Sequence, residues 1–251
     1  MNLLRSEWTK LRSVRSTWII VATTVVSAVA LGIVGASDVL GSSPSDLPTP
    51  WDPTATSLKG LLFAQLLIGM LGSFSVTGEY APGMIGTSLS VVPSRSRLLA
   101  AKTAVTALLA LGTSILTTAI SFTVVHLALG HAGLPAAGLG DAGVARALLA
   151  ATAYLTLVAL AGLAVGVLTR STAGTLAVLV GALLLVPALA PGLPGAAGDW
   201  FDRYWPATAG QAAYTVVRTD AVTPGAGLAI LSAAVAAVWL AGHLALRMRD
   251  I

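Results

Sequence analysis

The stretch Thr103–Leu127, TAVTALLALGTSILTTAISFTVVHL, contains no Asp, Glu, Lys or Arg. An α-helix rises 1.5 Å per residue, so about 20 apolar residues cross the roughly 30 Å hydrocarbon core of a bilayer. The stretch is long enough to do this, and it predicts a transmembrane helix. Five more stretches meet the same requirement: Thr17–Ala36, Leu58–Val76, Ala147–Leu168, Thr172–Ala190 and Gly225–Leu246.

The composition of the whole chain agrees with a membrane protein. Of its 251 residues, 56% are hydrophobic and only 10% are charged, and the mean hydropathy is +0.87. Too few polar side chains remain to cover a water-soluble globule. The net charge of +4 arises from residues beside the apolar stretches, so it indicates lipid headgroups rather than nucleic acid. We therefore expect an all-α membrane protein that forms a single domain over residues 1–251.

The basic residues predict the orientation of this domain. Short cytoplasmic loops carry an excess of Lys and Arg. If the N-terminus is cytoplasmic, ten basic residues lie inside and four outside. The inner ones are Arg5, Lys10, Arg12, Arg15, Arg95, Arg97, Lys102, Arg170, Arg247 and Arg249, and the outer ones are Lys59, Arg146, Arg203 and Arg218. Both termini are thus expected in the cytoplasm, with the protein in the plasma membrane.

The N-terminal residues 1–16 predict a helix that lies on the inner leaflet. At 100° per residue, the apolar side chains fall within an arc of roughly 140°, which Glu7 and Arg15 also enter. The side chains expected at the headgroups include Trp8, Leu11, Arg15 and Trp18. Two alternatives are a frayed basic tail and a cleaved signal peptide, although the apolar stretch is longer than a signal core of 7–15 residues.

The sequence contains little that could carry out chemistry. Phosphate-binding glycine loops, H-E-x-x-H and G-x-S-x-G are absent, and there is no cysteine for a disulfide or a thiolate site. His126, His131 and His243 are interpreted as packed or interfacial residues, and Gln65 as an interhelical hydrogen-bond partner. The spans lack a central ionisable group, which disfavours an ion-coupled transporter. We expect neither an enzyme nor a cofactor or metal site.

Small residues predict close packing in the fourth span. The segment GLAVG, Gly162–Gly166, is a G-x-x-x-G pattern, which lets two helix backbones approach closely. Packing within the chain and a dimer interface are both compatible with it, and the first is the simpler interpretation.

The longest polar interruption in the first half is the loop 79–102, in TGEYAPGMIGTSLSVVPSRSRLLAAK (Thr77–Lys102). Pro82 and Gly83 end one helix and Pro93 ends a second, short one. This short helix exposes Met84, Ile85 and Leu89, which need a partner or a membrane surface to cover them. SRSRLLAAK then leads as a helix into the third span.

Three stretches resemble the permease subunits of type-2 ABC exporters, in particular an actinobacterial group. SEWTKLRSVRSTW (Ser6–Trp18) is similar to the elbow helix of that family, and the loop of Thr77–Lys102 is similar to its first intracellular loop. RYWPATAGQAAYTV (203–216) is similar to its outer segment before the last span. The matching loop residues are Gly78, Glu79, Tyr80, Gly83, Met84, Ile85, Thr87, Ser88, Leu89, Pro93, Arg95, Arg97 and Ala100–Lys102, and those of the outer segment are Tyr204, Pro206, Ala209, Gly210 and Gln211.

The resemblance implies a coupling helix over Met84–Ser90, in which Met84, Ile85, Thr87, Ser88 and Leu89 contact a separate ATPase subunit. It implies a hinge formed by Glu79, Tyr80, Arg95 and Arg97. Glu79 either pairs there with Arg95 or Arg97 or is a solvated loop charge. The outer segment 191–224 would be re-entrant, with Tyr204, Trp205, Pro206 and Gln211, although its aromatic residues also suit anchoring at the headgroups.

The resemblance further implies the partners and the activity. Two ABC ATPase subunits and a second permease subunit, identical or homologous, would drive export by alternating access, with antibiotics or other drugs as the favoured cargo. The alternative from the residues themselves is a membrane sensor or assembly factor that docks a cytoplasmic partner through the same loop.

Overall fold

The computed structural model describes residues 3–47, 49–80, 95–217 and 222–248, and every regular element among them is helical. Six of these helical runs are long and apolar enough to cross a membrane, as the sequence predicts. They are α2 (Arg15–Leu40), α4 (Leu61–Tyr80), α6 (Arg95–His131), α7 (Val144–Thr169), the run that begins with α8 (Thr172–Val180), and α12 (Pro224–Met248).

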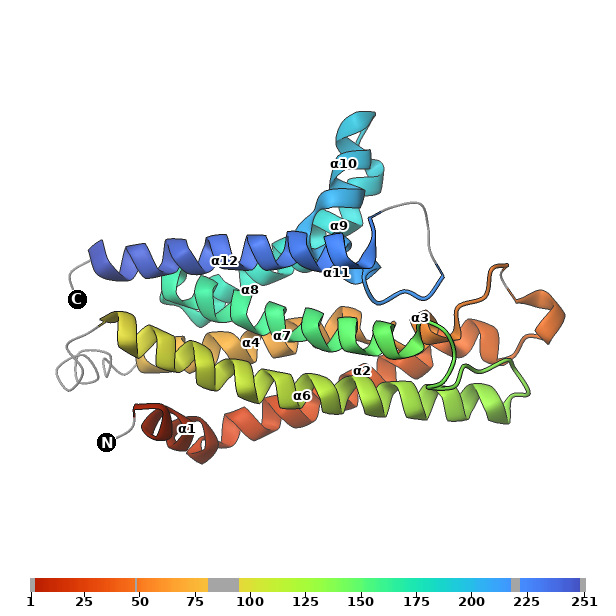
Figure 1. Ribbon diagram of the computed structural model, residues 1–251, viewed down its shortest axis with the longest axis horizontal. Helices are drawn as coiled ribbons and strands as arrows, with labels where there is room; N and C mark the ends of the chain where they lie inside the picture. Colours follow the sequence, from red (N-terminus) through yellow and green to blue (C-terminus); the bar gives the residue numbers. More distant parts are fainter. Residues whose placement is uncertain (1–2, 48, 81–94, 218–221, 249–251) are drawn as a thin grey trace.

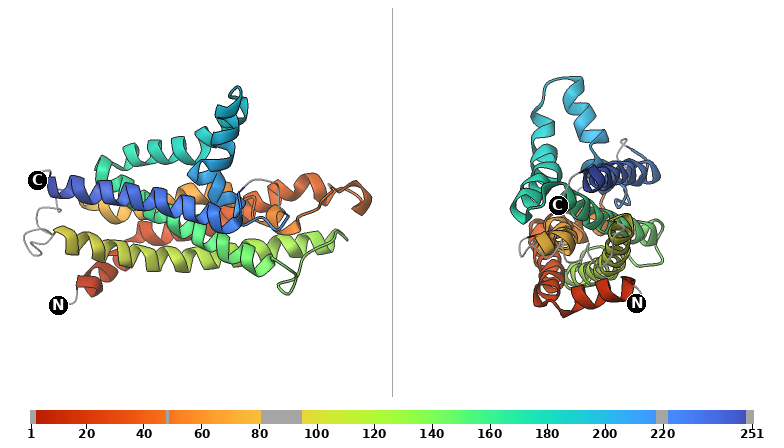
Figure 2. Two further views of the ribbon diagram at one scale, coloured as in Figure 1. Left: turned by 45° about the horizontal axis from the view of Figure 1, so that its top comes forward. Right: turned by 90° about the vertical axis from the view of Figure 1, so that its left-hand side faces the viewer.

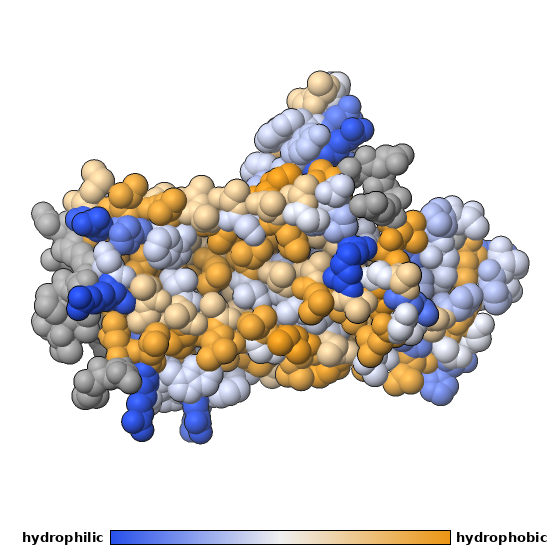
Figure 3. Space-filling model, viewed as in Figure 1, coloured by the Kyte–Doolittle hydropathy of each residue, from blue (hydrophilic) through white to orange (hydrophobic). Residues whose placement is uncertain are grey.

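The spans form an elongated bundle (Figure 1). The first helix, α1 (Leu3–Ser13), lies at the same end of the bundle as the last turn of α12. We call this the termini end and the opposite one the far end. Apolar side chains cover most of the length of the bundle, whereas many of the hydrophilic residues lie toward its two ends (Figure 3). This distribution fits a body embedded in lipid.

The centre of the bundle is α7, which packs against α4, α6 and α12. Its side chains Tyr154, Leu155 and Leu163 are fully buried. The outer spans α2, α8 and α12 leave most of their surface uncovered by the chain itself. In a bilayer these faces are available to lipid.

Glycine allows α4 and α7 to touch along their backbones. A Cβ atom built on Gly162 would lie 1.9 Å from the carbonyl oxygen of Gly69, and one built on Gly72 would lie 1.8 Å from that of Ala159. The contact at Gly166 is looser, because a Cβ atom there would lie 3.3 Å from the Thr77 side chain and 3.4 Å from Ser73. The G-x-x-x-G pattern therefore serves packing within the chain, the simpler of its two interpretations.

Replacing Gly162 by Ala should lower the thermal stability in detergent, because the two helices must separate to admit the methyl group. We expect a cost of about 1–3 kcal/mol. Gly112→Ala is the matched control, since nothing lies within 4 Å of its Cβ position. It should be neutral or stabilise by up to about 1 kcal/mol. Equal melting temperatures for the two variants would contradict the contact.

A break separates α1 from the first span. Val14 has extended backbone angles, φ −86° and ψ 121°, and α2 begins at Arg15. The indole of Trp18 donates to the carbonyl of Arg12 at 2.9 Å, which satisfies one acceptor that the end of α1 leaves open. The N-terminal helix thus ends at Ser13, earlier than the predicted 1–16, and Arg15 and Trp18 belong to the first span.

The fifth span changes its helical register. It passes from α8 through a π-helical turn, η2 (Gly181–Leu185), into α9 (Val186–Leu189) and the short η3 (Ala190–Gly192). The outer segment follows as two short helices, α10 (Ala196–Tyr204) and α11 (Pro206–Ala212). Together α9 and α10 project from the side of the bundle, while α11 returns to it (Figures 1 and 2). That the outer segment 191–224 re-enters a membrane, as the resemblance implies, stays a prediction.

Polar contacts fasten the end of this outer segment at the far end. The carboxylate of Asp52 caps α3 (Pro53–Ser57) by accepting from the amide of Ala55 at 2.8 Å. Its other oxygen accepts from the amides of Val216 and Val217 at 2.8 and 2.9 Å. The guanidinium of Arg146 donates to the carbonyls of Ala213 and Thr215 at 3.0 and 2.9 Å.

Candidate coupling site

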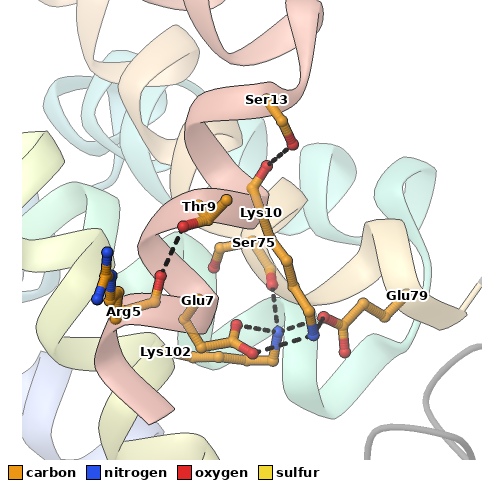
Figure 4. Close-up of polar contacts among 8 residues, drawn as sticks. All are labelled: Arg5, Glu7, Thr9, Lys10, Ser13, Ser75, Glu79 and Lys102. Carbon is orange, nitrogen blue, oxygen red and sulfur yellow. Dashed lines mark hydrogen bonds and ion pairs between the residues drawn. The ribbon is translucent and has the colours of Figure 1, made fainter. Parts of the chain in front are cut away.

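A cluster of four charged side chains lies where α1, α4 and α6 meet at the termini end (Figure 4). Glu7 and Lys10 come from α1, Glu79 from the last turn of α4, and Lys102 from the second turn of α6. Glu7 and Lys102 are only 3% and 4% exposed. The cluster therefore joins two loop-bearing spans to the N-terminal helix in a largely water-free position.

Lys102 is the centre of the cluster. Its Nζ atom donates to Glu7 Oε2 at 2.8 Å, to Glu79 Oε1 at 2.7 Å and to the carbonyl of Ser75 at 3.1 Å. An ammonium group has three donors, and all three are used here. A lysine that is buried in this way keeps its charge only if such partners replace the lost water.

Lys10 completes the charge balance. Its Nζ atom lies 3.1 Å from Glu7 Oε1 and 3.1 Å from Glu79 Oε1, so each carboxylate faces two ammonium groups. Burial opposes the charge of Lys10, but hydrogen bonds and attraction from Glu7 and Glu79 outweigh it and raise the pKa of Lys10 above 10.5. A lysine whose pKa is higher in the folded than in the unfolded protein stabilises the fold. This stabilisation is complete below the pKa of the unfolded state and is lost as the pH rises through the pKa of the folded state. Lys10 thus stays protonated at physiological pH.

The arrangement makes α1 part of the bundle. Removing one partner of a buried ion pair typically costs about 3–5 kcal/mol, since the other charge is left without compensation. Glu7 is one of the two charged residues that the sequence places within the apolar arc of the N-terminal helix. Its contact with Lys102 explains this position, while Leu4 and Trp8 of α1 remain exposed.

The structure describes only the borders of the predicted coupling loop. Tyr80 ends α4 and Arg95 begins α6, and Arg97 is exposed on the first turn of α6. Glu79 pairs with Lys102 and Lys10, and its predicted pairing with Arg95 or Arg97 stays a prediction. The predicted ATPase contacts lie outside the described residues: Met84, Ile85, Thr87, Ser88 and Leu89.

Sequence reasoning missed Glu7 and Lys102 as members of one site. A signal was present, because an acid in an apolar helix face and a lysine at the edge of a long apolar span both need a partner. The remaining interfacial residue, Leu11, lies half-buried on α1. Of the predicted outer residues, Tyr204 is exposed at the end of α10, whereas Trp205, Pro206 and Gln211 lie at or within α11 and are half-buried.

The described residues contain no group of three or more His, Cys, Asp or Glu side chains that could hold a metal ion. In the charged cluster, both oxygens of Glu7 and Oε1 of Glu79 contact lysine ammonium groups. The arrangement joins α1, α4 and α6 through side chains at one junction.

A family model described as "ABC-2 family transporter protein" matches residues 3–187. The chain belongs to the ABC-2 transporter family. It is a multi-pass permease subunit, and membership implies that an ABC ATPase works with it. The match includes α1, the charged cluster and the first five spans up to the π-helical turn. No curated protein matches the chain.

Lys102→Met should destabilise the permease by about 3–5 kcal/mol, because the side chain keeps its length but leaves two carboxylates undercompensated. Thermal unfolding in detergent and the rate of chymotryptic cleavage in α1 measure the effect. Arg12→Met is the control: Arg12 is an exposed base on the same helix and should change stability by less than about 0.5 kcal/mol. A Lys102 variant that unfolds and is cleaved like the control would show that the cluster does not hold α1.

Proposed function

We propose that the permease couples ATP hydrolysis on a separate ABC ATPase subunit to export of a substrate by alternating access. The observation that carries this proposal is the buried junction of Glu7, Glu79 and Lys102 in a chain of the ABC-2 family. Two of these residues flank the loop 81–94, so a force on that loop acts directly on α4 and α6.

The force would enter through the predicted coupling helix, Met84–Ser90. Closure of two ATPase subunits would push this helix, and the junction would pass the displacement to α1, α4 and α6 together. This role requires the termini end to face the cytoplasm. The excess of basic residues at that end, ten against four, agrees with this orientation. The complete transporter would contain two permease subunits, identical or homologous.

The spans are lined by aliphatic residues, but the bilayer itself requires that composition. We propose an antibiotic or another lipophilic drug as the cargo, which the resemblance to type-2 exporters supports.

Co-purification with an ABC ATPase subunit from the same source organism tests the proposed docking. The wild-type permease should retain the ATPase in detergent, and Ile85→Asp and Leu89→Asp should each lose it while keeping the wild-type melting temperature, because a carboxylate is costly in an apolar contact. Leu139→Asp is the matched control, since Leu139 is exposed in the loop between α6 and α7 at the far end. It should retain the ATPase.

If the ATPase stays bound in both loop variants, the loop is not the docking element. If no ATPase binds the wild-type chain, the result favours the alternative, a sensor or assembly factor that docks another cytoplasmic partner.

A further inference from the structure

An open groove of about 340 Å³ lies between α1 and α6 at the termini end. The first turn of α1 supplies Leu3 and Leu4 to its lining, and the first two turns of α6 supply Arg97, Ala100 and Ala101. The two alanine side chains are too short to fill the space beside the leucines, so a hollow remains. Among these lining residues Arg97 alone carries a charge.

The groove lies on the outer side of α6, away from the charged cluster. Lys102 is 4% exposed and faces the bundle, whereas Arg97 and Ala100 are exposed. At 100° per residue, Arg97 lies about 140° around the helix from Lys102. A molecule in the groove would therefore contact α1 and α6 without entering the junction of buried charges.

The length of α6 places the groove at the level of the lipid headgroups. The helix has 37 residues and is about 55 Å long, much longer than the roughly 30 Å hydrocarbon core. Its charged residues lie in the first two or three turns, before the uncharged stretch that begins at Thr103. The groove is formed by these first turns, so it lies beside the headgroups of the leaflet at the termini end.

An apolar stripe leads from the groove toward the middle of the membrane. From Ala100 onward, exposed apolar side chains of α6 recur at intervals of three or four residues, which places them on one face of the helix. From Ala100 to Leu111 the helix rises about 16 Å, about the hydrocarbon depth of one leaflet. The stripe consists of Ala100, Ala104, Leu108, Leu111 and Ile115.

The charge of the surrounding surface favours an anion. On the described parts of α1, α4 and α6 the acids are Glu7 and Glu79, and Lys10 and Lys102 balance them within the cluster. Basic side chains beside a membrane attract anionic lipids, and a guanidinium can bind a phosphate through two of its five N–H donors. Further exposed bases at this end are Arg5, Arg12, Arg15 and Arg97.

We propose that the groove binds an anionic phospholipid of the leaflet at the termini end. Its phosphate lies at Arg97, and one acyl chain follows the stripe from Ala100 to Ile115. A zwitterionic phospholipid has the same phosphate, but the surrounding bases repel its ammonium group. The lipid bridges α1 and α6 outside the charged cluster. This binding involves neither the ATPase nor the cargo, so the inference goes beyond the proposed transport function.

Native mass spectrometry tests the binding on the permease purified in a nonionic detergent, without any ATPase. Phosphatidylglycerol and phosphatidylcholine with identical acyl chains are titrated separately, so that only the headgroup differs. The wild-type permease should bind one phosphatidylglycerol per chain about tenfold more tightly than phosphatidylcholine. An excess of inorganic phosphate should not displace the lipid, because it has no acyl chain to occupy the stripe.

Arg97→Met removes the guanidinium from the groove. It should weaken the binding of phosphatidylglycerol about tenfold, which corresponds to the loss of a charge-assisted hydrogen bond, and should leave phosphatidylcholine binding nearly unchanged. Arg247→Met is the matched control, because Arg247 is an exposed base in the last turn of α12 that does not line the groove. It should keep the wild-type affinity.

Ala100→Phe fills the groove without changing the charge, and it should also weaken the binding of phosphatidylglycerol about tenfold. Ala237→Phe is the matched control on an exposed face of α12, away from the groove, and should have no effect. All four substituted side chains are exposed, so each variant should keep the wild-type melting temperature in detergent without lipid.

Equal affinity of the wild-type permease for the two lipids would overturn the proposal, and so would displacement of phosphatidylglycerol by inorganic phosphate. Unchanged binding in either Arg97→Met or Ala100→Phe would overturn it as well. An equal loss in Arg97→Met and Arg247→Met would mean attraction by the overall charge rather than a site. Because the assay contains no ATPase, its failure is distinguishable from a failure of the proposed ATPase docking.

Discussion

The burial of Lys102 is the constraint on which the termini end of this permease depends. An ammonium group at the start of a long apolar span needs acceptors, and two helices bring three of them: Glu7 from α1, and Glu79 and the carbonyl of Ser75 from α4. This requirement fixes α1 against the spans, although α1 is short and has exposed apolar residues that suit a membrane surface. The two spans on either side of residues 81–94 are thereby joined to a third helix.

The number and places of the spans followed from the sequence, because a bilayer imposes length and apolarity directly on the chain. The close packing of Gly162 and the interhelical hydrogen bond of Gln65 also followed from the sequence. The first is indicated by the G-x-x-x-G pattern and the second by a polar amide within an apolar span. The pairing of charges in the cluster did not follow from the sequence. Glu7 and Lys102 are far apart in sequence, and neither local pattern indicates which residue is its partner. The π-helical turn before Pro187 did not follow from the sequence either. It leaves the carbonyls of Ala182 and Leu183 to be satisfied by Trp205 and Gln65, which lie in other elements.

Two polar networks join helices of the bundle at different places. The charged cluster links helices at the termini end (Figure 4), and the network around Tyr154 links α11 to α4 and α7. α4 belongs to both, because Gln65 and Glu79 lie near its opposite ends. Its backbone contact with α7 through Gly69 and Gly72 makes this pair a stiff connection between the two places.

The measurement that tests the central claim most directly is a double-mutant cycle of Glu7→Gln and Lys102→Met, followed by reversible unfolding in mixed detergent. If α1 is held through this ion pair, the two effects are strongly non-additive, with a coupling energy of about 1–3 kcal/mol. Effects that add to within about 0.5 kcal/mol would contradict the account, because Glu7 and Lys102 would then contribute to stability independently.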